Sequence, residues 1–307
     1  MIIKNHSRIC IMISVAIIAV ALLMSLFGAG VNLGIDFTGG LNITYDMSQA
    51  FDQADVTAAL EAQGITVYSV AYSGAEGNIL QIRIPEVGSD AEIHSLQSGL
   101  ETALIEKYPN LNKETATASY VGPIAGAALV RNAILSVLLA NVLMLVYIAF
   151  RFDLYSGIAA VIGLVHDVLM MLSAMVILRS FIQMNSSFIA AMLTIVGYSI
   201  NNTIVIFDRI RENNTTPSYK ALSRVEVVNV SISQSLGRTI FTSLTSVTTI
   251  AVLYIMGVDS IREFSLPIIV GIFSSIYSAN MINGYVWAFL EDRNIGKKKA
   301  KLKTKKA

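Results

Sequence analysis

Cysteine, histidine and charge are all scarce in this sequence. Its 307 residues include one cysteine, Cys10, and three histidines, His6, His94 and His166. A single cysteine excludes an internal disulfide, and histidines so widely separated give no Cys/His metal-ligand pattern. Only 14% of the residues are charged and the net charge is +1, so no nucleic-acid partner is expected. There is also no glycine-rich phosphate-binding loop, and we expect no metal and no other cofactor.

What the sequence has instead is long apolar segments. Hydrophobic residues make up 54% of the chain, which is too many for an ordinary soluble domain. A helix needs about 20 apolar residues to cross a hydrocarbon core of roughly 30 Å. The first apolar segment is too long for a signal peptide, so we expect it to be retained as a helix. Six windows are long enough to span: 9–29, 126–150, 154–178, 185–207, 236–258 and 264–289.

Basic residues predict the orientation of these spans. With the N-terminus in the cytoplasm, the cytoplasmic segments contain fifteen of the 22 Lys and Arg residues. The large segment 30–125 then lies outside, with three basic and twelve acidic residues. We therefore predict a multi-pass membrane protein with both termini in the cytoplasm. Its regions are an N-terminus with the first span (1–29), an outer domain (30–125), a membrane region (126–290) and a basic tail (291–307) that contacts the lipid bilayer.

The outer segment has the pattern of a small α+β domain. Leu80, Ile82 and Ile84 alternate with Gln81 and Arg83, as in a strand with one buried face. The same reasoning predicts strands at 41–47, 65–72, 78–84 and 115–121 and helices at 52–63 and 89–108. The order βαββαβ is ferredoxin-like. The expected fold is thus an α-helical polytopic membrane protein with six transmembrane helices and this α+β domain between helices one and two.

Glycine-rich connectors flank the outer domain. GIDFTGG at 34–40 leads into it, and VGPIAG at 121–126 leads out. Glycine permits tight turns and positive φ, so the two segments are either plain connectors or hinges on which the domain swings. The hinge candidates are Gly34, Gly39, Gly40, Gly122 and Pro123.

A histidine and an aspartate, His166 and Asp167, lie near the centre of the third span. A carboxylate at that depth costs about 2.5–3.5 kcal/mol. Asp167 is therefore hydrogen-bonded to a neighbouring helix, part of a proton relay, or less deep than the window implies. Because adjacent residues of a helix do not face each other, we expect the two side chains to have different partners.

The stretch 185–213 turns polar inside its own span. Polar side chains in hydrocarbon usually face protein or a water-filled cavity, which makes Tyr198, Asn201 and Asn202 candidates for function. The span ends in a charged run that we expect to be a solvated, locally ion-paired helix end. This run contains Asp208, Arg209, Arg211 and Glu212. A loop and a separate amphipathic helix along the membrane face are predicted for 213–235.

The last two spans are rich in hydroxyl and small side chains. Arg238, Thr242 and Thr249 share one face of the fifth span. An arginine always carries charge, so Arg238 must reach the interface or meet a partner. In the sixth span, small residues such as Gly271 and Ser274 indicate close helix packing.

Read in order, several motifs resemble the SecF branch of the SecD/SecF family, whose members are membrane subunits of protein export within the RND superfamily. They are GIDFTGG, VGP at 121–123, FRF at 150–152, HD at 166–167, GYSINNTIVIFDRIREN at 197–213 and SISQSLGRT at 231–239. The chain starts at its own first span, so it resembles a standalone member and not a fused SecDF.

The resemblance implies an auxiliary, non-enzymatic subunit of the Sec preprotein translocase in the bacterial cytoplasmic membrane. Such a subunit pairs with SecD, associates with the SecYEG channel and acts on a translocating preprotein, with YajC as a further candidate partner. It is expected to use the proton-motive or sodium-motive force in late steps of export, through swinging of the outer domain.

One position departs from the family pattern. The family often has Asn-Asp where this chain has Asn201-Asn202, and that aspartate is a candidate proton carrier near an arginine matched by Arg238. Asn202 does not titrate, so either a SecD carboxylate carries the ion beside Asn202 and Arg238, or Asp167 has the larger part. We favour the first interpretation on the sequence. The coupling candidates are Arg238, Asn202, Asn201, Asp167, Tyr198 and Thr242.

Other functions compete with ion-coupled export. A non-transporting scaffold for SecD and SecYEG would use the polar residues only for helix packing. A small-molecule exporter of the RND superfamily is disfavoured by the small outer domain and by the lack of a second set of six spans. An intramembrane enzyme is least favoured, because we expect no Ser/His, Asp/Asp or metal-ligand set to converge in the spans.

Overall fold

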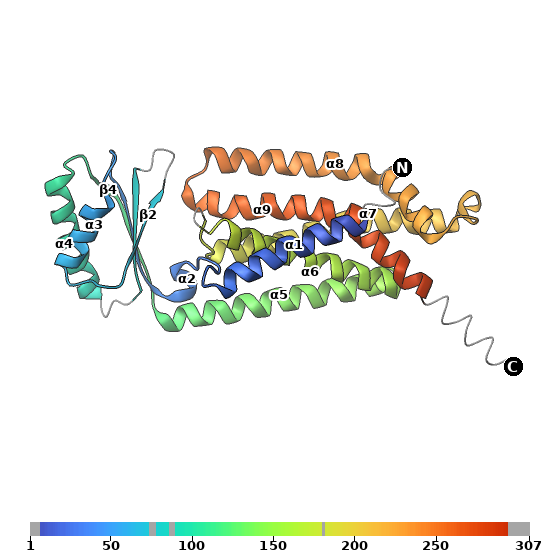
Figure 1. Cartoon of the computed structure of the whole chain (residues 1–307), viewed down its shortest axis with the longest axis horizontal. Helices are drawn as coiled ribbons and strands as arrows, with labels where there is room; N and C mark the ends of the chain where they lie inside the picture. The colour runs from blue at the N-terminus through green and yellow to red at the C-terminus, as the bar shows by residue number, and fades with distance from the viewer. Residues whose placement is uncertain (1–6, 74–77, 86–89, 180–181, 294–307) are drawn as a thin grey trace. The chain divides into compact units, whose positions relative to one another are not determined.

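The computed structural model describes residues 7–73, 78–85, 90–179 and 182–293, which form two compact units (Figure 1). An α+β unit comprises the described residues from 33 to 133. A helical unit combines those before residue 33 with those after residue 133. The chain therefore leaves the helical unit after one helix and returns to it through α5, as the hydropathy pattern predicts.

The α+β unit contains the βαββαβ order expected from the sequence. After a short helix α2 (Ile35–Thr38), its elements are β1 (Gly40–Asp46), α3 (Gln53–Ala62), β2 (Ser69–Ser73), β3 (Ile79–Ile84), α4 (Asp90–Lys107) and β4 (Asn112–Val121). The strand order is β2-β3-β1-β4 and every neighbouring pair is antiparallel. This is the split βαβ arrangement. The predicted second strand is shorter than expected, because it begins at Ser69 and not at residue 65.

The period-two pattern of the strands builds the core of this unit. In the register, Ile43 pairs with Ile82 on one side and with Ala118 on the other. Alternate residues Leu41, Ile43 and Tyr45 are fully buried and cluster with apolar residues of α3 and α4, such as Leu60 and Leu104. One face of the sheet therefore packs against both helices.

The helical unit contains six candidate membrane helices among the described residues. They are α1 (Ser7–Leu26), α5 (Pro123–Arg151), α6 (Leu154–Ile177), α7 (Ser186–Thr215), α8 (Arg224–Met256) and α9 (Asp259–Ser278), the last continuing through a π-helical turn (Ala279–Asn283) to Arg293. Within the helical unit α9 packs against α6, α7 and α8, and α1 packs against α6. Figure 1 shows α9 running beside α8 and behind α1. This arrangement brings α1, α6, α7 and α9 together around one point.

The structure corrects the prediction for residues 213–235. The amphipathic stretch is not a separate surface helix, because α8 runs without interruption from Arg224 to Met256. Its first turns are amphipathic because Val227, Val228 and Ile232 pack into the interior of the helical unit. Likewise, α7 continues to Thr215 and includes the whole charged run that starts at Asp208.

Candidate functional site

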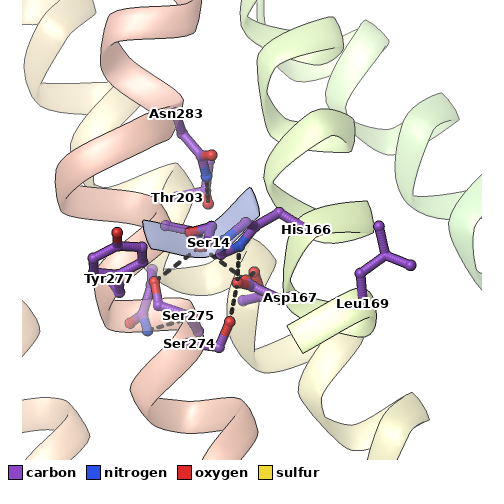
Figure 2. A network of polar contacts seen from close by, with 12 residues as sticks. Ser14, His166, Asp167, Leu169, Thr203, Ser274, Ser275, Tyr277 and Asn283 are labelled. Atoms are coloured by element: carbon purple, nitrogen blue, oxygen red, sulfur yellow. Dashed lines mark hydrogen bonds and ion pairs between the residues drawn. The ribbon is translucent and has the colours of Figure 1, made fainter. Parts of the chain in front are cut away.

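The candidate site is a buried carboxylate, Asp167 of α6, surrounded by hydroxyl groups (Figure 2). Its side chain has no exposed surface. Ser199 of α7 donates to Oδ2 at 2.5 Å, Ser278 of α9 donates to the same oxygen at 2.8 Å, and Ser274 of α9 donates to Oδ1 at 2.7 Å. A carboxylate at this depth is costly unless its oxygens are hydrogen-bonded. The three serines therefore explain how Asp167 is accommodated here.

His166 extends the site to the first helix. Its Nδ1 lies 3.0 Å from Oδ1 of Asp167, and its Nε2 lies 2.8 Å from Oγ of Ser14. The prediction that His166 and Asp167 have different partners is thus wrong in part. The two residues diverge by roughly 100° about the helix axis, but the imidazole is long enough to reach the neighbouring carboxylate. The result is a continuous chain of polar contacts, Ser14 to His166 to Asp167.

Aromatic packing holds the histidine ring in place. The ring stacks on Tyr277 of α9, with the two ring centroids 6.0 Å apart. The hydroxyl of Tyr277 donates to the carbonyl oxygen of Cys10 at 2.5 Å. Tyr277 therefore links α9 to α1 next to the ring, and His166 is fixed by contacts from two helices other than its own.

This convergence also overturns the expectation that no serine–histidine pair meets within the spans. The order Ser14, His166, Asp167 is that of a hydrolase triad. A hydrolase also needs free N–H donors beside the serine to stabilise an oxyanion. Ser14 lies inside α1, where backbone N–H groups bond within the helix. The arrangement presents one carboxylate and one imidazole to hydroxyl groups from three other helices.

Small residues allow the helices to approach closely enough for these contacts. A Cβ atom on Gly163 of α6 would overlap the side chain of Asn283, and one on Gly271 of α9 would overlap Ile195 of α7. The close packing predicted for the sixth span is therefore present. The serines of α9 have a further role that packing alone did not predict, because Ser274 and Ser278 face Asp167 one helical turn apart.

A second layer of polar contacts lies beside the first. Asn202 of α7 donates to Oγ of Ser275 at 2.9 Å, and Asn283 donates to Oγ1 of Thr203 at 2.9 Å. The π-helical turn that contains Asn283 begins directly after Ser278. Such turns are frequent at functional sites. Here the turn connects the residue that binds Asp167 to the residue that binds Thr203.

The structure divides the predicted coupling residues into an inner and an outer group. Asp167 and Asn202 are buried in the helical unit. Asn201, Arg238 and Thr242 are exposed on α7 and α8. Asn202 therefore bonds to Ser275 and, among the described hydrogen bonds, not to Arg238. Tyr198 is half-buried, and its hydroxyl has no hydrogen-bond partner among the described residues.

The hydroxyl groups of α8 do not form a continuous polar path. Thr245, Thr248 and Thr249 each donate to a backbone carbonyl three or four residues earlier in the same helix. A threonine that bonds its own helix can face lipid at little cost. The face of α8 that carries Thr245, Thr248 and Thr249 is thus exposed, with these hydroxyl groups hydrogen-bonded to their own helix, and Arg238 lies at one end of it.

The charged end of α7 is ion-paired. Arg151 at the end of α5 donates to Asp208 at 3.2 Å, and Arg209 donates to Glu212 at 2.7 Å one turn along. Both pairs are partly exposed, so each contributes at most about 1 kcal/mol. Arg211 has no carboxylate partner among the described ion pairs.

The hinge candidates lie at the entrance and exit of the α+β unit. Gly39 and Gly40 have φ of 75° and 111°, which only glycine adopts readily. A Cβ on Gly40 would lie 2.5 Å from the carbonyl oxygen of Ile84. Gly34 caps α2 and Pro123 begins α5, where its missing N–H costs nothing. Gly122 lies between β4 and α5 in open space, and whether these residues act as hinges remains a prediction.

Two family models match this chain. One, for the C-terminal part of the protein export membrane protein SecD/SecF, covers residues 101–293, and the SecD/SecF GG motif covers residues 25–50. Protein translocase subunit SecF of Alicyclobacillus acidocaldarius is 34% identical over 91% of this chain and 89% of its own length. SecF of Desulfurispirillum indicum is 33% identical over 95% of this chain and 92% of its own length.

Fused relatives are similar to the chain over part of their length. Protein translocase subunit SecDF of Bacillus subtilis is 33% identical over 88% of this chain and 35% of its own length. The crystal structure of SecDF from Thermus thermophilus, a translocon-associated membrane protein, superimposes with a TM-score of 0.80 at 32% identity. The match covers 95% of this chain and 39% of the SecDF chain. Relatives that carry both parts in one polypeptide imply association with SecD.

Proposed function

The chain belongs to the SecD/SecF family as a SecF subunit of the protein-export machinery, and on this basis we propose that it acts with SecD to couple an ion-motive force to late steps of export. In this proposal the termini are cytoplasmic and the α+β unit lies outside the bacterial cytoplasmic membrane. The excess of Lys and Arg in the assigned cytoplasmic segments supports that orientation. SecYEG and the translocating preprotein are the further partners.

The observation that carries the proposal is the environment of Asp167. This carboxylate is fully buried within a membrane helix and accepts bonds from three serines on two other helices. Ionisable residues at such depth are rare and mark ion or proton pathways. Moving one charge across the membrane supplies about 2.3 kcal/mol per 100 mV, which matches the few kcal/mol that separate two conformations of a protein.

The burial pattern favours Asp167 over Asn202 of α7 and Arg238 of α8 as the ion-binding group of this subunit. Asn202 cannot titrate and is bonded to Ser275, and Arg238 is exposed. The ion site of this chain therefore centres on α6, α7 and α9. A carboxylate with three hydroxyl ligands suits either a proton or Na⁺, and both remain part of the proposal.

The outer group supplies the surface for SecD. Asn201 on α7 and Arg238 and Thr242 on α8 are polar and exposed, although they lie within or beside predicted spans. Exposed polar groups in hydrocarbon are stabilised when another protein covers them. The proposed cover is the membrane part of SecD, whose own polar residues would then meet Arg238.

The decisive variant is Asp167→Asn, which keeps the shape of the side chain but removes its charge and titration. We expect ion-driven stimulation of preprotein export in SecYEG–SecD–SecF vesicles to fall to the level without this subunit. Co-purification of SecD should be unchanged, because Asp167 is buried and does not lie on the exposed face of α7 and α8. Arg238→Met should instead reduce co-purification of SecD, because Arg238 lies on the exposed surface that is proposed to contact SecD.

Asp208→Asn is the matched control, since Asp208 is a partly exposed carboxylate paired with Arg151. It should retain stimulation. Full ion-driven stimulation by Asp167→Asn would contradict the proposal. It would favour the scaffold alternative, in which the buried network only holds the helices together.

A further inference from the structure

A small cavity lies beside the charged end of α7, away from Asp167. Its volume is about 140 Å³, and it forms where the end of α7 meets the turn between α5 and α6 and the last helical segment. The lining residues include Phe152, Phe207, Ile210, Arg211, Asn214 and Trp287. On α7 they recur at three- and four-residue spacing, so one face of the charged run lines the cavity.

Trp287 lines this cavity and is 4% exposed. Its Nε1 is fully buried, so the indole contributes apolar surface to the cavity wall.

Two residues with hydrogen-bond donors line the cavity. Arg211 is exposed and has no carboxylate partner among the described ion pairs, whereas Arg209 is paired with Glu212. The Oδ1 of Asn214 accepts from Arg224 at 2.6 Å, which leaves the Asn214 amide N–H groups as donors. The cavity therefore has one guanidinium and one amide, with a second arginine behind the amide.

The one carboxylate on the wall is already occupied. Asp153 caps α6, and its oxygens accept from the backbone N–H groups of Tyr155 and Ser156 and from the Ser156 hydroxyl. The positive end of the helix dipole offsets its charge. The hydroxyl of Thr215 donates to the carbonyl of Glu212. The groups left over are donors, and they suit an anion.

We propose that this cavity binds the phosphate group of an anionic lipid headgroup. The apolar side chains of Phe152, Phe207 and Ile210 suit the glycerol and first acyl carbons, and Arg211 and Asn214 suit the phosphate oxygens. Basic pockets between membrane helices near the cytoplasmic interface favour such headgroups. The bound lipid would tie α7 to the last helix at this end of the helical unit. This proposal does not rest on ion coupling.

The single tryptophan of the chain allows a direct test, because Trp287 is the only tryptophan and lies on the cavity wall. The full chain is placed in phosphatidylcholine nanodiscs with increasing fractions of phosphatidylglycerol, and tryptophan emission is recorded. We expect a saturable change in emission. Arg211→Gln should shift the midpoint about tenfold toward higher phosphatidylglycerol, as for the loss of one charge-assisted hydrogen bond.

Arg209→Gln is the matched control, because Arg209 is one helical step from the cavity wall and is paired with Glu212. It should leave the midpoint within about twofold. Arg211→Lys keeps the charge, so its midpoint should fall between those of wild type and Arg211→Gln. Such partial rescue would show that the shift in Arg211→Gln comes from the lost charge and not from a disturbed fold. Equal shifts for both glutamine variants would indicate diffuse surface charge and overturn the site. An equal response to inorganic phosphate in neutral nanodiscs would overturn the lipid as the ligand, and no response to either would overturn the site.

Discussion

At the scale of single residues, Asp55 shows how neighbours set a pKa in the α+β unit. Lys107 Nζ lies 2.6 Å from Oδ1 of Asp55, and the hydroxyl of Tyr108 donates to Oδ2 at 2.7 Å. The hydrogen bond from Lys107, followed by that from Tyr108, lowers the pKa of Asp55 below its ordinary value of 3.8. In Lys107→Met we expect this pKa to rise toward 3.8, measured by NMR titration of labelled aspartate carboxyl groups.

The same pair predicts a pH window for its effect on stability. Because the folded-state pKa of Asp55 is lowered, its contribution is present above about pH 4 and is lost as the pH falls through the folded value. The pKa of Lys107 is raised from 10.5, so its contribution is present below that pH and is lost above it. The stability difference between wild type and Lys107→Met should therefore shrink below about pH 4. A difference that persists unchanged there, or an equal pKa shift in Lys113→Met, would contradict this assignment.

Residue by residue, the sequence predicts what is costly but not what compensates for the cost. The sequence points to Asp167 because a charge in the middle of a span is expensive. It does not point to Ser14, because one serine in an apolar helix has no pattern and its partner His166 is 152 residues away. Periodicity also could not decide which of the adjacent residues Asn201 and Asn202 faces inward. Only the packing of α7 against α9 determines that.

At the scale of elements, α8 illustrates a helix start that local chemistry determines. Ser223 accepts from the backbone N–H of Glu226, and the Glu226 side chain accepts from that of Ser223, forming a capping box. Ser223→Ala should cost about 0.5–2 kcal/mol at this end. Amide hydrogen exchange in the first turn of α8 should then accelerate about 2- to 30-fold.

Ser218→Ala provides the comparison, because Ser218 is exposed in the turn Pro217–Tyr219 just before α8. It should leave exchange in α8 unchanged. Similar acceleration in both variants would show that the connecting segment, and not the capping box, determines where the helix starts.

Elements were predictable to the extent that one periodicity dominated each segment. The strands with strict alternation, such as Ile79–Ile84, lie where the pattern predicts. The prediction for the segment 213–235 is wrong because a polar break at Thr215–Thr216 and an amphipathic run are also typical of a surface helix. In the structure its apolar face packs inside the helical unit and continues into a span. Sequence amphipathicity reports burial but not what the face is buried against.

At the scale of the whole molecule, the chain has two kinds of hydrophobic core. The core of the α+β unit, with Leu60 fully buried, contains only residues of that unit. The helical unit has two cores, one of which contains Ile232 and Trp287. Both cores are formed by residues that follow residue 133, and the second also includes Val31 from the start of the chain. The order of elements and the number of spans were predictable from hydropathy alone. The meeting of α1, α6, α7 and α9 at Asp167 was not, because hydropathy does not specify which helices are neighbours.

Separate cores predict separate unfolding. Leu60→Ala removes a fully buried side chain in the α+β unit and should cost about 2–5 kcal/mol there. Exchange of the β1 amides should accelerate, while Trp287 emission and exchange in α7 stay unchanged, because both report on the helical unit. Ile232→Ala, a deletion of similar size at an equally buried position in α8, should give the reverse pattern. If either variant destabilised both units to the same extent, the chain would unfold as one cooperative body. The swinging of an independent outer domain would then have no thermodynamic basis.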